Sequence, residues 1–313
     1  MLASAPARSL TLPVLAASLV TGLVTIALTA PLQGQKSSPS TEVELTVEGP
    51  AAPLYPGGVG LVRVSASRPL ATLEGEAFGR EVHFWTTGDR TQWEGLVGLG
   101  FDDGPGQHSM TIRAGGSSGA HATATVALTV KAKKYETRRL SVAANMVNPP
   151  DEEAARIAAD SKAMADVFAG VWPERLWQGP FGTPVPGAAT SSFGRLSVMN
   201  GESRGRHLGA DFRAAEGTPV RAPNGGRVAL AKDLYFAGNT VIVDHGLGLF
   251  SLVAHLSRID VSVGETVMRG DPLGLSGATG RVTGPHLHWA IRMGPQSVDP
   301  SALMAALETQ VAP

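Results

Sequence analysis

The sequence predicts a mainly β protein with an N-terminal Ig-like β-sandwich, a connecting segment that holds one helix, and a second β region at the C-terminal end. The 313 residues include 38 Gly and 22 Pro, and charged residues make up 17% of the chain. Such a composition suits a turn-rich β protein better than a helical one. The length is sufficient for two domains of ordinary size, each with its own core.

The first segment, residues 1–35, predicts export. Arg8 is followed by an uncharged and mostly apolar run from Leu10 to Ala30, with small residues near its end. A short positive region before an apolar stretch is typical of a secretory signal peptide. The run is also close to the ~20 residues that a membrane-spanning helix needs, so an uncleaved N-terminal membrane anchor is the alternative. A buried core helix is a third interpretation. Both leading interpretations place the rest of the chain outside the cytoplasmic membrane.

Residues 42–130 predict the sandwich, an accessory domain. Five stretches alternate between apolar and polar residues, and clusters of Gly, Pro or Asp separate them; they read E-V-E-L-T-V, V-G-L-V-R-V-S-A, E-V-H-F-W-T-T, H-S-M-T-I-R-A and T-A-T-V-A-L-T-V. Alternation with a period of two indicates strands with one buried face. Several short strands at this spacing favour a β-sandwich. This part of the chain contains no cluster of catalytic residue types.

Residues 131–189 predict a linker, with a helix over residues 151–170. Three acidic residues open that helix, where the helix dipole favours negative charge, and Gly170 follows its end. A stripe of apolar residues at helical spacing should pack onto a domain; its members are Ile157, Met164, Val167, Phe168 and Val171. We interpret this stripe as core rather than as a cofactor site.

Composition excludes several classes of function. The chain has no Cys, so a thiol nucleophile, a thiolate metal site and a disulfide framework are all ruled out. The formal net charge of −1 gives no indication of a nucleic-acid partner. Any metal would therefore have to be held by His, Asp or Glu.

Five of the eight histidines fall between residues 207 and 288; they are His207, His245, His255, His286 and His288. His207 and Asp211 lie in G-R-H-L-G-A-D-F-R, His255 lies in S-L-V-A-H-L-S, and the last pair lies in T-G-P-H-L-H-W. Side chains two apart on a strand share a face, so His286 and His288 should point the same way. Imidazole and carboxylate groups are zinc-type ligands, and catalytic zinc usually has three protein ligands and a water. His245, in V-D-H-G, is interpreted as a structural residue.

These motifs resemble the lysostaphin-type (LytM-domain) zinc metalloendopeptidases, a family of peptidoglycan hydrolases. The resemblance covers residues 191–304, and beyond the histidine motifs it includes S-S-F-G, E-G-T-P-V-R-A-P-N-G-G and G-D-P-L-G-L-S-G-A-T-G. It implies an antiparallel β metallopeptidase domain of the LytM, or duplicated hybrid motif, type over residues 190–308. Two positions depart from the family pattern, because Val253 stands where an aromatic residue is common and Leu196 where Arg is common. Both departures bear on the shape of the groove and hence on substrate preference.

The resemblance also implies roles for individual residues. His207, Asp211 and His288 match the family's zinc ligands, with one Zn²⁺ per chain, and His255 and His286 match its two catalytic histidines. The expected reaction is attack of a zinc-activated water on a scissile carbonyl, assisted by these two histidines as proton acceptor and oxyanion stabiliser. The sequence does not decide which histidine has which role.

The expected function is therefore hydrolysis of peptide cross-links in bacterial peptidoglycan by an exported enzyme, periplasmic or otherwise associated with the cell envelope. Stem peptides and their cross-links are the expected partners. The alternative is a catalytically silent wall-binding protein that activates other cell-wall hydrolases or acts as a scaffold for them. The presence of all three ligands and both catalytic histidines favours the enzyme.

Overall fold

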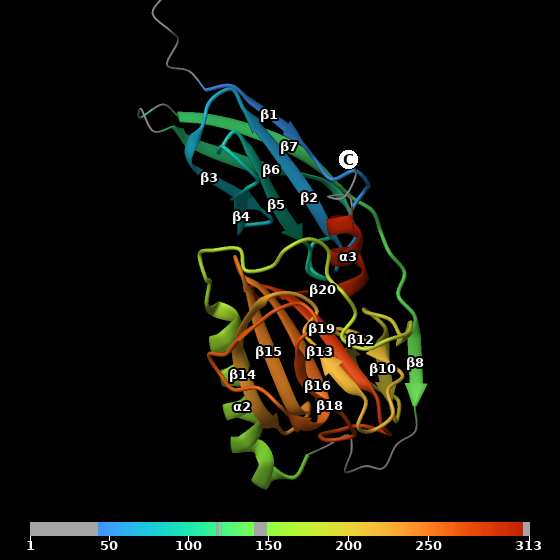
Figure 1. The fold of residues 1–313 in the computed structure, drawn as a ribbon. Coiled ribbons are helices and arrows are strands. Elements are labelled where there is room, and N and C mark those ends of the chain that lie inside the picture. Colours follow the sequence, from blue (N-terminus) through green and yellow to red (C-terminus); the bar gives the residue numbers. More distant parts are fainter. Residues whose placement is uncertain (1–42, 117–118, 120, 141–148, 309–313) are drawn as a thin grey trace, which may run out of the picture. The chain divides into compact units, whose positions relative to one another are not determined.

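The computed structural model describes residues 43–116, 119, 121–140 and 149–308. The predicted signal or anchor, residues 1–35, lies outside the described residues. Within them, no helix combines the length and the apolar character needed to cross a bilayer. Strands dominate the described chain, which confirms the prediction of a mainly β protein (Figure 1).

The N-terminal region is one antiparallel sheet in the order β1-β2-β5-β4-β3-β6-β7. After β1, the backbone of Leu54 pairs with Thr129 and Lys131 at the end of β7, so the two edges of the sheet approach each other and give it a barrel-like form. The Ig-like comparison stays a prediction. The bounds of the strands are β1 Leu45–Glu48, β2 Val59–Ala66, β3 Leu70–Ala77, β4 Arg80–Thr86, β5 Gln92–Gly98, β6 Gly106–Gly116 and β7 His121–Val130.

The C-terminal region is built on a second antiparallel sheet, whose main path is β17-β14-β15-β16-β19-β12-β9. Three short strands, β13, β18 and β20, pair beside this path, and α3 follows the last of them. The bounds are β9 Ala189–Ser191, β12 Ala210–Phe212, β13 Pro219–Arg221, β14 Gly226–Leu234, β15 Gly238–Gly246, β16 Leu249–Ile259, β17 Thr266–Val267, β18 Pro272–Ser276, β19 Leu287–Met293, β20 Gln296–Val298 and α3 Pro300–Glu308.

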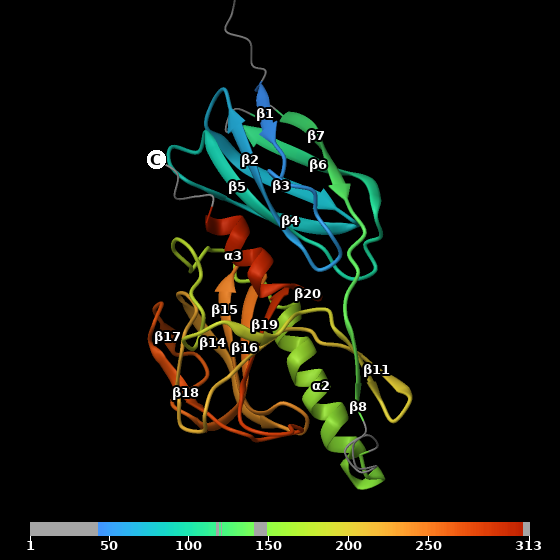
Figure 2. The same ribbon diagram turned by 90° about the vertical axis from the view of Figure 1, so that its right-hand side faces the viewer.

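The predicted linker takes part in the fold. Its strand β8 (Thr137–Leu140) pairs in parallel with β10 (Leu196–Met199), which pairs with β11 (Glu202–Arg206) to form a three-stranded sheet (Figure 2). The helix α2 spans Ala154–Ala169 after a short 3-10 turn, η1, at Asp151–Glu153. Further along, Trp177 and Phe181 are buried in the C-terminal core. The division into domains stays a prediction, but this segment is more than a tether.

Helix α2 covers one face of the C-terminal sheet (Figure 1). Phe168 meets the ring of Phe250 edge to face, at 5.5 Å between ring centroids. Asp160 on the same helix is buried, and its carboxylate accepts hydrogen bonds from Lys232 Nζ and from the backbone N–H of Tyr235, both at 2.8 Å. The predicted stripe is therefore largely correct. It is wrong at Val171, which lies beyond the end of the helix and is 49% exposed.

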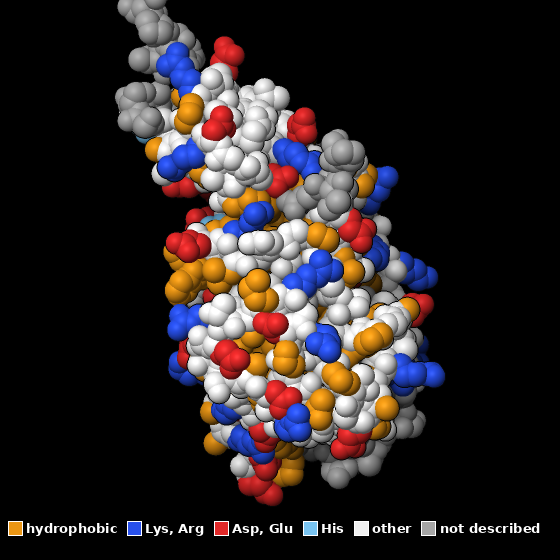
Figure 3. All heavy atoms as spheres, in the orientation of Figure 1, with side chains coloured by type: hydrophobic (Ala, Val, Ile, Leu, Met, Phe, Trp, Pro, Cys, Tyr) orange, Lys and Arg blue, Asp and Glu red, His pale blue; other side chains and the backbone are white. Residues whose placement is uncertain are grey.

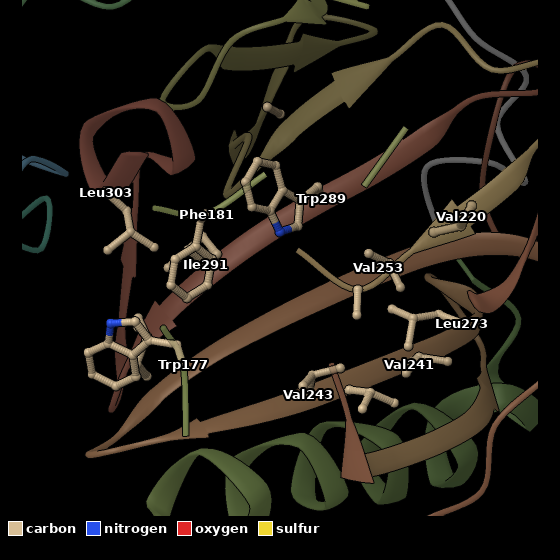
Figure 4. Close-up of a cluster of buried hydrophobic side chains, with 14 of the residues drawn as sticks. Trp177, Phe181, Val220, Val241, Val243, Val253, Leu273, Trp289, Ile291 and Leu303 are labelled. Atoms are coloured by element: carbon tan, nitrogen blue, oxygen red, sulfur yellow. The ribbon is translucent and has the colours of Figure 1, made fainter. Parts of the chain in front are cut away.

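The opposite face of the sheet carries the main apolar core, and this core continues into the N-terminal region. Trp177, Phe181, Trp289 and Ile291 gather there with the valines of the central strands (Figure 4). Trp85 of β4 joins the same cluster and meets Trp177 edge to face, at 5.2 Å between ring centroids. Apolar residues of β2 and β5 also contribute, so the predicted accessory and C-terminal domains share one hydrophobic cluster.

Candidate metal centre and groove

Strand register brings the predicted ligands together. Asp211 on β12 lies directly across from His288 on β19, and side chains that face each other across paired strands share one face of the sheet. His207 follows the end of β11 and enters from the side. The three ligand atoms lie close together: His207 Nε2 is 2.9 Å from Asp211 Oδ1 and 3.0 Å from His288 Nδ1, and His288 Nδ1 is 2.9 Å from Asp211 Oδ1.

The chemistry of these donors fits a cation. His207 Nδ1 lies 3.1 Å from the carbonyl oxygen of Ser192, and because a carbonyl oxygen only accepts, Nδ1 carries the proton. His207 Nε2 therefore presents a lone pair to the Asp211 carboxylate. Burial raises the pKa of Asp211, but hydrogen bonds and positive charge from protonated rings of His207 and His288 outweigh it and hold that pKa well below its usual range. With neutral rings, the lone pair of His207 Nε2 facing the ionised carboxylate is repulsive unless a cation lies among the ligand atoms.

The two predicted catalytic histidines lie in the same groove. The ring of His255 is 4.8 Å from the ring of His286 and 6.0 Å from that of His288. Carbonyl oxygens fix both: His255 Nδ1 donates to Thr279 and His286 Nδ1 donates to Gly284, each at 2.9 Å. Each ring therefore keeps its Nε2 unprotonated and available. His286 Nε2 lies 3.9 Å from Asp211 Oδ1, beside the ligand cluster.

His255 reaches the groove through a β-bulge. Strict alternation would place its side chain on the same face as Val253, which is buried in the main core. On β15, Thr240 alone stands opposite both Ala254 and His255, and His255 has a left-handed φ of 65°. A bulge redirects a side chain, and strained backbone of this kind clusters at functional sites. The motif S-L-V-A-H-L-S gives no indication of this change of face.

Burial keeps His255 neutral. The side chain is only slightly exposed, and desolvation, helped by the positive charge that His288 can carry, lowers the pKa of His255 to about 4. A neutral imidazole at neutral pH can accept a proton, which is the property that a general base needs.

His245 lies outside the groove and is fully buried. Its Nδ1 donates to the Gly225 carbonyl at 2.7 Å, and its Nε2 accepts from the Ser251 hydroxyl at 2.8 Å. Phe181 packs edge to face on the ring. With both nitrogens engaged inside the core, the geometry agrees with the structural interpretation of this histidine.

The burial of His245 predicts a loss of stability in acid. Desolvation lowers its pKa from 6.5 to about 4 in the folded chain. Between those pH values the unfolded state binds a proton that the folded state does not, so the free energy of unfolding should fall as the pH drops from 6.5 towards 4, by about 3 kcal/mol. Urea unfolding at a series of pH values measures this. A His245→Gln chain should show a shallower slope over that interval, and equal slopes for the two chains would contradict the assignment.

The support of His207 extends into the N-terminal region. Ser192, whose carbonyl fixes the His207 ring, precedes Phe193, and Phe193 stacks on Phe101 at 5.1 Å between ring centroids. Tyr135 meets Phe101 edge to face. Arg206, which precedes His207, places its guanidinium over the rings of both Phe101 and Tyr135. Phe101, Tyr135 and Phe193 form an aromatic cluster behind the ligand loop, by which we mean the segment that begins at His207 after β11.

The groove around the histidines has a volume of about 470 Å³. One wall is formed by β8 and β10, and the other by the segments around Phe236 and Thr283. Of the residues predicted for the site, His207, Asp211, His255, His286 and His288 all line it. The sequence interpretation did not include Arg138, Arg195 and Arg281, which line the same groove.

A β domain with converging His, Asp and His ligands and two more histidines at the same groove has the features of a metallopeptidase. Comparison with known families agrees: residues 205–300 match Peptidase family M23. The resemblance to the lysostaphin type predicted from the motifs is confirmed.

Several similar proteins are named for cleavage of peptidoglycan or as peptidases. The chain is 46% identical over 85 residues to the peptidoglycan DD-endopeptidase ShyA of Vibrio cholerae, covering 27% of this chain and 20% of that protein. It is 42% identical over 94 residues to the DD-carboxypeptidase/endopeptidase Mpg of Neisseria meningitidis, covering 30% of this chain and 22% of that protein. The matches thus span about a fifth of these curated relatives. A solved structure, a putative M23 peptidase from Pseudomonas aeruginosa, is similar over 82% of this chain and 96% of its own, at 29% identity and a TM-score of 0.62.

Proposed function

We propose that this chain is a zinc-dependent endopeptidase that hydrolyses peptide cross-links of bacterial peptidoglycan. The observation that carries the proposal is the convergence of five side chains at one groove of an M23 domain. His207, Asp211 and His288 are the proposed ligands of one Zn²⁺, and His255 and His286 are the proposed catalytic residues. The curated relatives named for peptidoglycan cleavage support the choice of substrate.

The proposed role of each catalytic histidine depends on its protonation state. Zn²⁺ held by the three ligands would supply a Lewis acid that polarises a carbonyl group and acidifies water. His255 Nε2, neutral and largely buried, is suited to accept a proton from the attacking water. His255, once protonated, is suited to deliver that proton to the leaving amine, and His286 in its protonated form is suited to stabilise an oxyanion. The carbonyls of Thr279 and Gly284 keep both rings oriented throughout.

The proposal includes location. A peptidoglycan substrate requires an enzyme outside the cytoplasm, in the periplasm or elsewhere in the cell envelope, and the apolar run within residues 1–35 would serve as its signal peptide or as an N-terminal membrane anchor. The alternative of a catalytically silent activator shares that location and differs only in chemistry.

The first experiment is digestion of isolated peptidoglycan by the chain from Lys36, supplied with zinc. We expect loss of cross-linked muropeptide dimers and release of monomers, both abolished by a chelator and restored by added zinc. Mass spectrometry of the products identifies the bond that is cut.

A His255→Ala chain separates the enzyme from the activator. It should bind one zinc and fold as the wild type does, yet cleave at least about a hundredfold more slowly, because a positioned general base typically contributes 10²–10⁴-fold. If the wild-type chain binds zinc, cleaves no dimers and still accelerates a second hydrolase, the activator is the correct interpretation.

A further inference from the structure

The groove carries a strong local positive charge. Among the described residues that line it, Arg138, Arg195 and Arg281 are basic and Asp211 alone is acidic. The whole chain has a formal net charge of −1, so the concentration of Arg does not reflect general basicity. On the face shown in Figure 3, Lys and Arg side chains are interspersed with Asp and Glu. The groove therefore differs from that surface in the balance of its charges.

Strand alternation builds the wall that holds Arg138 and Arg195. Arg138 on β8 lies in register with Ser197 on β10, and Arg195 is two residues before Ser197, so all three share one face. All three line the groove. Leu196, which follows Arg195, pairs with Arg206. The guanidinium of Arg206 lies over the ring of Phe101 in the aromatic cluster and not in the groove lining. The alternation thus separates a structural arginine from two that face the groove.

Arg138 and Arg195 have unused donors. Within the described part of the chain neither residue forms an ion pair, and Arg195 Nε is buried without a hydrogen-bond partner. A buried N–H without a partner costs free energy unless a ligand satisfies it. Arg195 is also next to the ligand loop, because its carbonyl accepts the backbone N–H of His207 at 2.9 Å. A group bound by Arg195 would therefore lie close to the bond being cut.

Arg281 lines the same groove next to Phe236. Its backbone N–H donates to the Phe236 carbonyl at 2.9 Å, and its guanidinium stacks over the Phe236 ring at 4.3 Å from the centroid. Stacking on an aromatic face holds a guanidinium in place. Arg281 therefore adds a fixed positive charge to the groove.

We propose that the groove selects acidic peptides by binding a free carboxylate of the substrate through Arg138 and Arg195, with the positive charge of Arg281 adding to the attraction. The inference rests on the proposed peptidase function and specifies its substrate class. The guanidinium fork matches a carboxylate with two parallel hydrogen bonds, which a carboxamide cannot reproduce. A stem peptide offers such groups as internal α-carboxylates and as its C-terminal carboxylate.

The test uses binding as well as cleavage. A synthetic stem-peptide dimer with an N-methylated cross-link, which resists hydrolysis, is titrated into the zinc-loaded chain by calorimetry. Two further dimers carry a carboxamide in place of either the internal or the C-terminal carboxylate. We expect the amidation that removes the bound carboxylate to raise the Kd on the order of tenfold, which corresponds to about 1.4 kcal/mol, because the hydrogen bonds lose their charge assistance.

Substitution identifies the residues. Arg138→Gln and Arg195→Gln should each raise the Kd for the free-carboxylate dimer by a similar factor and leave unchanged the Kd for the dimer in which the bound carboxylate is amidated. In the cleavable dimer the same changes should raise KM more than they lower kcat. Arg113→Gln, which removes the same charge from β6 of the N-terminal sheet, is the control. It should change neither the Kd of the dimers nor the KM and kcat of cleavage.

The outcomes separate this inference from the proposed function. If the wild type cleaves peptidoglycan but binds carboxylate and carboxamide dimers equally, carboxylate selection is wrong and the peptidase assignment stands. If the arginine variants weaken both dimers equally, the arginines act through the fold and the inference also fails. If no cleavage occurs while carboxylate discrimination persists and the variants abolish it, the groove binds acidic peptides and the peptidase assignment fails.

Discussion

An Asp211→Ala chain is expected to lose its zinc and to cleave peptidoglycan at least about a thousandfold more slowly. Asp211 Oδ1 lies 2.9 Å from both His207 Nε2 and His288 Nδ1, so the substitution removes the only anionic donor of the cluster. Metal catalysis supplies several kcal/mol of charge stabilisation, and about 4 kcal/mol corresponds to a factor of a thousand in rate. Zinc content by mass spectrometry and the rate of dimer loss measure the two effects.

The control for this substitution is Asp233→Ala. Asp233 is a carboxylate of the same domain that pairs with Arg156 on the surface, at 2.7 Å, and it lies outside the histidine groove. Its removal should leave zinc content and rate within a factor of about two, because exposed ion pairs contribute little. Full activity in a zinc-loaded Asp211→Ala chain would contradict the assignment of Asp211 as a ligand.

A Trp177→Ala chain is expected to lose about 3–5 kcal/mol of unfolding free energy, the usual effect of truncating a large buried aromatic residue. Trp177 is 1% exposed and packs against Trp85 of the N-terminal sheet and near Phe181 of the C-terminal core. The cavity left behind would lie in the cluster that both regions share. Denaturant unfolding followed by circular dichroism measures the loss. We expect one transition for the whole chain, with its midpoint at a lower denaturant concentration than in the wild type.

Two substitutions control for residue type. Trp172→Ala, five positions earlier, removes a tryptophan that is 40% exposed and should cost only about 0.5–1 kcal/mol. Trp177→Phe should cost less than Trp177→Ala, because it retains the ring and removes an indole N–H that has no partner among the described residues. Two separate transitions in the wild type, with Trp177→Ala shifting one of them alone, would show that the shared cluster does not couple the regions.

The sequence was sufficient to predict the five histidine and aspartate positions of the groove. Asp211 and His288 were assigned as ligands through the resemblance of their motifs to the family, and the pairing of β12 with β19 places both side chains on one face. The motifs therefore identified the residues that converge in the groove. The same local pattern predicted α2 and most of its buried stripe.

Features that depend on tertiary contacts could not be predicted in this way. The left-handed backbone of His255 arises from a register shift between two strands, and no residue type in V-A-H-L-S signals it. Asp160 accepts hydrogen bonds from Lys232 and Tyr235, and both are more than 70 residues away from it in the chain. Arg138 lies in the segment predicted to be a linker, and only its pairing with β10 places it in the groove.

The aromatic cluster behind the ligand loop has a consequence for how such chains can be recombined. Phe101 belongs to the N-terminal region, Tyr135 to the connection and Phe193 to the loop whose neighbouring carbonyl fixes the ring of His207. A chimera that joined this M23 domain to an unrelated accessory module would leave Phe193 and Arg206 without the rings they pack on. The N-terminal region is thus a supporting element of the metal centre, and a successful exchange of modules would have to carry Phe101 and Tyr135, or equivalent rings, with it.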